Sequence, residues 1–162
     1  MKHLEKIYDK ILDDKSLDKK LNLWREEGKS IVFSNGCFDI LHRGHVEYLS
    51  KAADLGDKLI IGLNTDDSVK RLKGPSRPVN DEKARAILLA ALEFVDAVVF
   101  FEEDTPYNLI RRIQPDVLVK GKDYKVEDIV GYEIVTAKGG KVETIELVDG
   151  FSTTKTIEKM RD

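Results

Sequence analysis

The stretch Ile31-Val32-Phe33-Ser34-Asn35-Gly36-Cys37-Phe38-Asp39-Ile40-Leu41-His42-Arg43-Gly44-His45 decides the fold of this chain. Its apolar beginning, Ile31–Phe33, is typical of a buried strand, and a turn-rich connector follows. A helix is predicted next, because apolar residues share one face at helical spacing: Val46, Leu49, Ala52 and Ala53. The stretch is thus a strand, a loop and a helix start in direct succession.

Two histidines, His42 and His45, lie at this predicted helix start. Residues three apart on a helix share a face, and a helix N-terminus offers free N–H groups and positive dipole charge to phosphate. Zinc binding with Cys37 is an alternative, since zinc takes nitrogen and sulfur ligands. The chain holds one cysteine and three histidines, which is too few to favour zinc. A structural role for both histidines is a second alternative, and phosphate chemistry is the favoured interpretation.

The composition is typical of a globular domain that resides in the cytoplasm. The chain has 162 residues, 41% hydrophobic and 35% charged, with a formal net charge of −3. This charge predicts no general attraction to nucleic acid or to an anionic membrane. A single cysteine fits a reducing compartment, and no apolar run reaches membrane-spanning length.

Residues 1–28 are predicted to form an N-terminal helical extension, and residues 29–162 a separate domain. Two amphipathic helices are indicated by apolar residues at helical spacing: first Leu4, Ile7, Tyr8, Ile11 and Leu12, then Leu17, Leu21 and Trp24. Ser16 is the expected cap of the second helix and Gly28 its stop. The extension is either a packing appendage or a dimer contact.

The rest of the chain alternates between strands and helices. Five strands are predicted at Ile31–Phe33, Leu59–Leu63, Ala97–Phe101, Val117–Val119 and Val142–Val148. Helices are predicted near Val46–Leu55, Glu82–Phe94, Tyr107–Ile113, Gly131–Ala137 and Thr153–Met160. This alternation predicts an α/β fold with parallel strands and right-handed crossovers. Ligands of such sheets bind beyond the carboxyl ends of the strands.

Two helix starts carry unusual charges. Ordinary starts have an oxygen cap and acidic residues, as in Asn80-Asp81-Glu82 and Asp104-Thr105-Pro106. The starts His42-Arg43-Gly44-His45 and Ser152-Thr153-Thr154-Lys155 instead place cations at the positive end of the dipole. Cations at this end of a helix are unfavourable, and a bound polyanion would make them favourable. The alternative explanation is that Arg43 and Lys155 simply point into solvent.

Asn35–His45 resembles the signature of the HxGH nucleotidyltransferases. Four more segments resemble the D-glycero-D-manno-heptose 1-phosphate adenylyltransferase family: Arg71–Asn80, Phe101–Pro106, Val119–Tyr124 and Asp149–Thr154. The resemblance implies a Rossmann-like, doubly wound, five-stranded parallel sheet of order 3-2-1-4-5. Strand order then reverses between strands one and four, so that Asn35–His45 and Lys120–Tyr124 converge on one cleft.

The resemblance further implies a reaction and its partners. ATP would donate AMP to the heptose 1-phosphate, giving ADP-heptose and pyrophosphate by direct attack on the α-phosphorus, without Cys37 as nucleophile. Mg²⁺ would accompany ATP, held mainly by phosphates, and the protein would be a homodimer. The alternatives are another HxGH enzyme, such as a glycerol-3-phosphate cytidylyltransferase, and a non-catalytic nucleotide-binding regulatory module.

Residue roles follow from the same resemblance. The catalytic residues would be His42, His45 and Lys73. The nucleotide-binding residues would be Asn35, Gly36, Cys37, Phe38, Gly44, Gly121, Asp123, Ser152, Thr153 and Thr154. The substrate-binding residues would be Asp39, Asp66, Lys70, Arg85 and Lys120. No residue is assigned as a metal ligand with certainty.

Several of these roles keep an alternative. Asp39 would organise the loop, help to hold Mg²⁺ or simply form a turn. Arg85 would be structural or contact phosphate, and Asp66 would face the substrate or cap a helix. The cations from Lys70 to Arg77 would form a mobile arm over the phosphates or an ordinary solvated run of charge.

Overall fold

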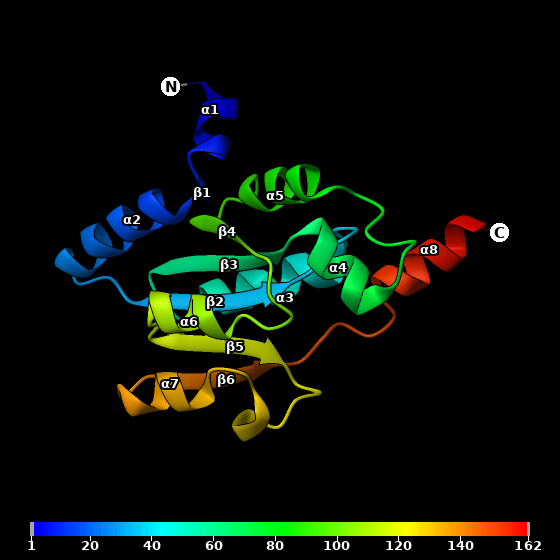
Figure 1. The fold of residues 1–162 in the computed structure, drawn as a ribbon. Coiled ribbons are helices and arrows are strands. Elements are labelled where there is room, and N and C mark those ends of the chain that lie inside the picture. Colours follow the sequence, from blue (N-terminus) through cyan, green and yellow to red (C-terminus); the bar gives the residue numbers. More distant parts are fainter. Residues whose placement is uncertain (1, 162) are drawn as a thin grey trace.

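Six parallel strands form one sheet in the computed structural model, which describes residues 2–161 (Figure 1). The order across the sheet is β1-β4-β3-β2-β5-β6, and every neighbouring pair is parallel. The strands are β1 (Ile11–Leu12), β2 (Ile31–Gly36), β3 (Lys58–Asn64), β4 (Ala97–Phe101), β5 (Val117–Gly121) and β6 (Lys141–Ile145). Strands β2 to β6 have the order that the family resemblance implied.

Strand β1 is the difference from the five-stranded prediction. Ile11 and Leu12 were expected to continue the first helix, but they pair with Val98 and Val99 of β4. Two apolar residues fit a helix face and a strand equally well, so periodicity alone does not distinguish them. In the fold these residues extend the sheet beyond β4, and Val98 N donates to the carbonyl oxygen of Lys10 at 2.8 Å.

Eight α-helices and one short 3₁₀ helix accompany the sheet in residues 2–161. They are α1 (His3–Tyr8), α2 (Asp14–Glu26), α3 (Arg43–Ala53), α4 (Asp66–Lys73), α5 (Glu82–Ala90), α6 (Tyr107–Ile113), η1 (Val126–Asp128), α7 (Tyr132–Ala137) and α8 (Thr153–Arg161). None of these helices is long and apolar enough to cross a bilayer.

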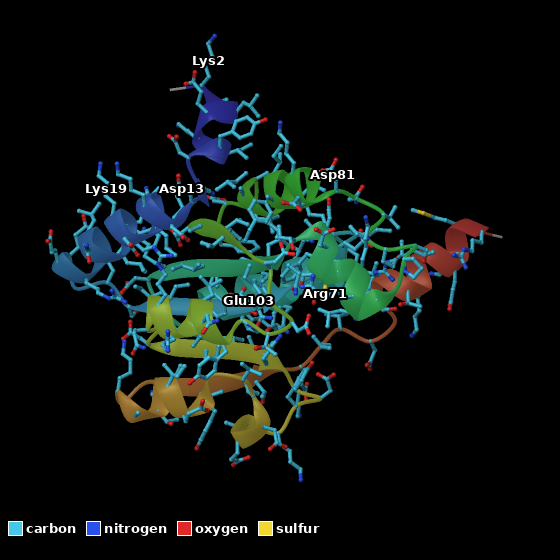
Figure 2. The ribbon with its side chains drawn as sticks, in the orientation of Figure 1. Lys2, Asp13, Lys19, Arg71, Asp81 and Glu103 are labelled. Atoms are coloured by element: carbon cyan, nitrogen blue, oxygen red, sulfur yellow. The ribbon has the colours of Figure 1, made fainter. Side chains whose placement is uncertain are left out.

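Two of these helices depart from the sequence prediction. Asp13, and not Ser16, caps α2: its carboxylate accepts from Ser16 N at 2.8 Å, and Ser16 Oγ accepts from Asp13 N at 2.9 Å. Figure 2 labels Asp13 at this helix start. The cations from Lys70 to Arg77 were expected to form either a mobile arm or a solvated run of charge, and those up to Lys73 lie in helix α4. This helix is capped by Thr65, whose hydroxyl accepts from Ser68 N.

The two faces of the sheet carry separate hydrophobic cores. Val32 points to the face covered by α3 and α5, whereas Ile31 and Phe33 point to the face covered by α2, α6 and α7. Figure 1 shows α3 and α6 on opposite sides of the sheet. This alternation along one strand is the period of two that a doubly covered parallel sheet requires.

The N-terminal segment shares the second of these cores. Leu12, Leu17, Leu21 and Trp24 are buried together with Phe33 and its neighbours in the sheet. The segment therefore adds an edge strand and a covering helix to the domain that follows it.

Leu17→Ala is expected to lower the free energy of unfolding by about 2–5 kcal/mol, because it removes a fully buried side chain and leaves a cavity. Leu23→Ala is the matched control, since Leu23 lies on the same helix with 47% of its side chain exposed. Urea denaturation measures both. Equal stability of the two variants would contradict the packing described here.

Candidate active site

A cleft of about 680 Å³ lies at the carboxyl ends of β2 and β5. The two strands are neighbours, so the loops that follow them face each other, as the strand order predicts. The cleft brings together these predicted residues: Asn35, Gly36, Cys37, Phe38, Asp39, His42, Gly44, His45, Lys73, Lys120, Gly121, Asp123, Ser152, Thr153 and Thr154. Asp66, Lys70 and Arg85 are not among its lining residues.

The histidine pair forms a stacked unit at the start of α3. The ring centroids of His42 and His45 lie 3.7 Å apart, and the rings are inclined by 19°. His42 precedes the helix as its N-cap residue, and its backbone N–H donates to His45 Nδ1 at 3.3 Å. Since Nδ1 of His45 accepts, the proton of the neutral ring lies on Nε2.

Both histidines are neutral at pH 7 in the ligand-free protein. Burial lowers the pKa of His42 below its ordinary value. Burial, together with the nearby charge of His42, lowers the pKa of His45 to about 4. The pair therefore offers neutral N–H donors, and a bound polyanion would favour their charged forms.

Two polar atoms in the cleft wall lack partners among the described residues. Asn35 Oδ1 and His42 Nδ1 are both buried, and neither has a hydrogen-bond partner. A buried unsatisfied group of this kind costs about 1–3 kcal/mol. A polar ligand that pairs with these atoms would recover that cost, so the wall is suited to polar groups.

The cations around the cleft differ in their availability. Lys120 Nζ lies 3.4 Å from the carbonyl oxygen of Asn35 and 5.6 Å from the ring centroid of Tyr124, and burial lowers its pKa. Lys73 is exposed and also lines the cleft. Within residues 2–161, neither lysine forms an ion pair. Arg71 (Figure 2) instead pairs with Glu102 and Asp104.

Asp39 organises the loops through a buried carboxylate. Its oxygens accept from Val79 N at 2.8 Å, Asn80 N at 2.9 Å and Arg77 Nε at 2.7 Å. Burial alone would raise the pKa of this carboxyl, but the hydrogen bonds outweigh burial and lower it. Both oxygens are thereby engaged, which favours loop organisation over metal binding among the alternatives for Asp39.

Clusters of metal-ligating side chains were sought among residues 2–161. No group of three or more His, Cys, Asp or Glu side chains in residues 2–161 is arranged to hold a metal ion.

Arg85 is a structural residue in this geometry. Its side chain is fully buried and donates to the carbonyl oxygens of Cys37 at 2.8 Å, Asn64 at 2.8 Å and Asn80 at 3.0 Å. It also pairs with Asp66 at 2.9 Å. Asp66 thus serves as the partner of Arg85, while Thr65 caps α4. Lys70 is exposed on α4 outside the cleft.

Sequence reasoning missed several residues of the cleft. Tyr48, whose hydroxyl lies 3.0 Å from Ser34 Oγ, and Pro106 both line it. Phe151 lies against His42, with 6.1 Å between the ring centroids. Phe151 lies in the motif segment Asp149–Thr154. The sequence does not indicate its contact with His42, because an isolated aromatic residue does not specify its partner.

The fold is a parallel α/β sheet with a histidine pair at a helix start, and this pair lines the cleft. The model of the cytidylyltransferase-like family matches residues 33–159. The chain belongs to this family.

Relatives of the chain are longer proteins. The "Bifunctional protein HldE" of Nitrobacter hamburgensis is 60% identical over 143 residues, 88% of this chain and 29% of the relative. The protein of the same name from Syntrophotalea carbinolica is 55% identical over 163 residues, 100% of this chain and 33% of the relative. The chain thus spans about a third of the length of these curated relatives.

Two solved structures share the fold. The lipopolysaccharide core biosynthesis protein of Thermoplasma volcanium has a TM-score of 0.61 and 30% identity, covering 75% of this chain and 98% of its own. A pantoate-beta-alanine ligase of Francisella tularensis has a TM-score of 0.58 and 15% identity, covering 94% of this chain and 79% of its own. At 15% identity, the similarity to the ligase shows a shared fold alone.

The depressed pKa of His45 predicts an acid-dependent loss of stability. As the pH falls from 6.5 to about 4, the unfolded state takes up a proton that the folded state refuses, so folding stability decreases. Above pH 6.5 this contribution is fully present. NMR titration of the ligand-free protein should place the His45 pKa near 4. An ordinary pKa for His45 would contradict the buried, stacked geometry.

Arg85→Lys is expected to lower the free energy of unfolding by about 3 kcal/mol, because a lysine cannot reach all four acceptors from one buried position. Arg111→Lys is the control, since Arg111 is exposed on α6 and forms no ion pair within residues 2–161. Thermal and urea denaturation report the difference. A loss confined to activity would indicate that Arg85 contacts substrate.

Proposed function

We propose that this protein is a heptose 1-phosphate adenylyltransferase: it transfers AMP from ATP to D-glycero-D-manno-heptose 1-phosphate and releases pyrophosphate. The neutral, stacked His42/His45 pair in the cleft wall is the observation that carries the proposal. Family membership supports nucleotidyl transfer, and the names of the relatives support a place in sugar metabolism of the cell surface.

The reaction is a direct displacement at the α-phosphorus. An oxygen of the sugar phosphate forms the new P–O bond, and the bond to pyrophosphate breaks on the opposite side. Nε2–H of His45 donates to the phosphate oxygens, and Lys73 and Lys120 supply positive charge as negative charge develops. Burial raises the pKa of the Cys37 thiol, which keeps it protonated and fits a reaction without a covalent enzyme intermediate.

Magnesium enters this proposal together with ATP. It would neutralise the triphosphate, coordinated mainly by phosphate oxygens, because Asp39 is engaged by protein donors. A homodimer and a cytoplasmic location remain predictions from the resemblance. A glycerol-3-phosphate cytidylyltransferase remains the alternative enzyme, since the same cleft would hold CTP phosphates equally well.

A pyrophosphate-release screen tests the proposal. ATP and CTP are each combined with heptose 1-phosphate, glucose 1-phosphate and glycerol 3-phosphate in the presence of Mg²⁺. Release with ATP and heptose 1-phosphate alone is expected. Release with CTP and glycerol 3-phosphate would assign the alternative enzyme, and ATP binding without turnover in any combination would assign the regulatory module.

His45→Gln should reduce kcat on the order of 10²–10³-fold, because it removes a donor aimed at charge that develops in the transition state. His3→Gln is the matched control, since His3 is exposed on α1 outside the cleft. Steady-state kinetics of both variants give the comparison. Unchanged kcat in His45→Gln would remove His45 from the mechanism.

A further inference from the structure

Segment 147–161, which contains α8, is attached to the rest of the protein through few polar contacts. Within the described residues, no hydrogen bond or ion pair joins this segment to another element: Ser152 bonds only inside its own helix start. No residue of α8 is buried. Figure 1 shows α8 beyond the carboxyl edge of the sheet, connected to β6 by an extended stretch.

Phe151 makes the contacts that do join this segment to α3. Its ring lies 6.1 Å from the His42 ring between centroids, inclined by 29°. The guanidinium carbon of Arg43 lies 5.7 Å from the Phe151 ring centroid. A Cβ added at Gly44 would lie only 3.1 Å from Cβ of Phe151, so the two helix starts approach as closely as glycine permits.

These contacts extend an aromatic column through the site. Phe38 meets His45 edge-on, with 5.2 Å between centroids and 70° between planes. His45 stacks on His42, and the Phe151 ring lies near the His42 ring in turn. The column therefore links the loop after β2, both histidines and Phe151, two residues before α8.

We propose that Phe151 is a positioning residue that holds the start of α8 against the start of α3, so that both helix N-termini face one triphosphate. The inference rests on the proposed function, in which Ser152, Thr153 and Thr154 contact the phosphates. Without the ring, α8 would retain its own hydrogen bonds but lose its fixed place beside His42. Affinity for the phosphate chain would then fall more than affinity for the nucleoside.

Phe151→Leu removes the ring and keeps apolar bulk, whereas Phe151→Tyr keeps the ring. Binding of ATP and of AMP to each variant is measured by calorimetry. Phe151→Leu is expected to weaken ATP binding about tenfold, the size of one aromatic contact, and AMP binding much less. Phe151→Tyr should restore the ratio of ATP to AMP affinity. Leu88→Ala, at an exposed position of α5 outside the cleft, is the control for surface substitution.

Two results would overturn the role of Phe151: equal weakening of ATP and AMP binding in Phe151→Leu, or unchanged affinity for both. Binding of the wild type is tested without any sugar phosphate, so this outcome is independent of the pyrophosphate-release screen. A wild type that binds ATP but turns over no sugar phosphate would refute the proposed reaction and leave the affinity ratio as the test of Phe151.

Discussion

The buried guanidinium of Arg85 is the interaction on which the candidate site depends. It joins the loop after β2, the end of β3 and the start of α5 by donating to Cys37, Asn64 and Asn80. The loop needs this support, because Phe38 has a φ of 44°, a left-handed conformation uncommon for a residue other than glycine. Charged hydrogen bonds inside the protein hold the backbone where a free loop would not stay.

The distribution of charge around the cleft follows from this arrangement. Arg77 and Arg85 are neutralised by Asp39 and Asp66, so their charge is used within the protein. Lys73 and Lys120 line the cleft without such partners in the described part of the chain. The histidines add neutral donors, whose pKa values are depressed by burial. Lys73 and Lys120 are therefore available to a ligand, whereas Arg77 and Arg85 support the fold.

The sequence located the cleft but not the state of every side chain in it. His42 and His45 follow β2 and Lys120 lies near the end of β5, and the strand order implied by the family resemblance was enough to predict that they meet. Asp66 and Lys70 were expected to contact substrate, but they lie outside the cleft lining. Asp66 instead pairs with Arg85, and Lys70 is exposed on α4. Hydrophobic periodicity predicts neither outcome.

The sequence by itself determined strands β2 to β6, their parallel pairing and the histidine pair at a helix start, because these depend on local apolar patterns and a short motif. Their order across the sheet followed from the family resemblance. The tertiary structure decided the rest. Asp39 finds its donors 38 to 41 residues away and Arg85 reaches Cys37 across 48 residues. Strand β1 and the contact of Phe151 with His42 likewise form only when distant segments meet. Such pairings are selected by the packed fold, which gives each buried polar group a partner that no local pattern specifies.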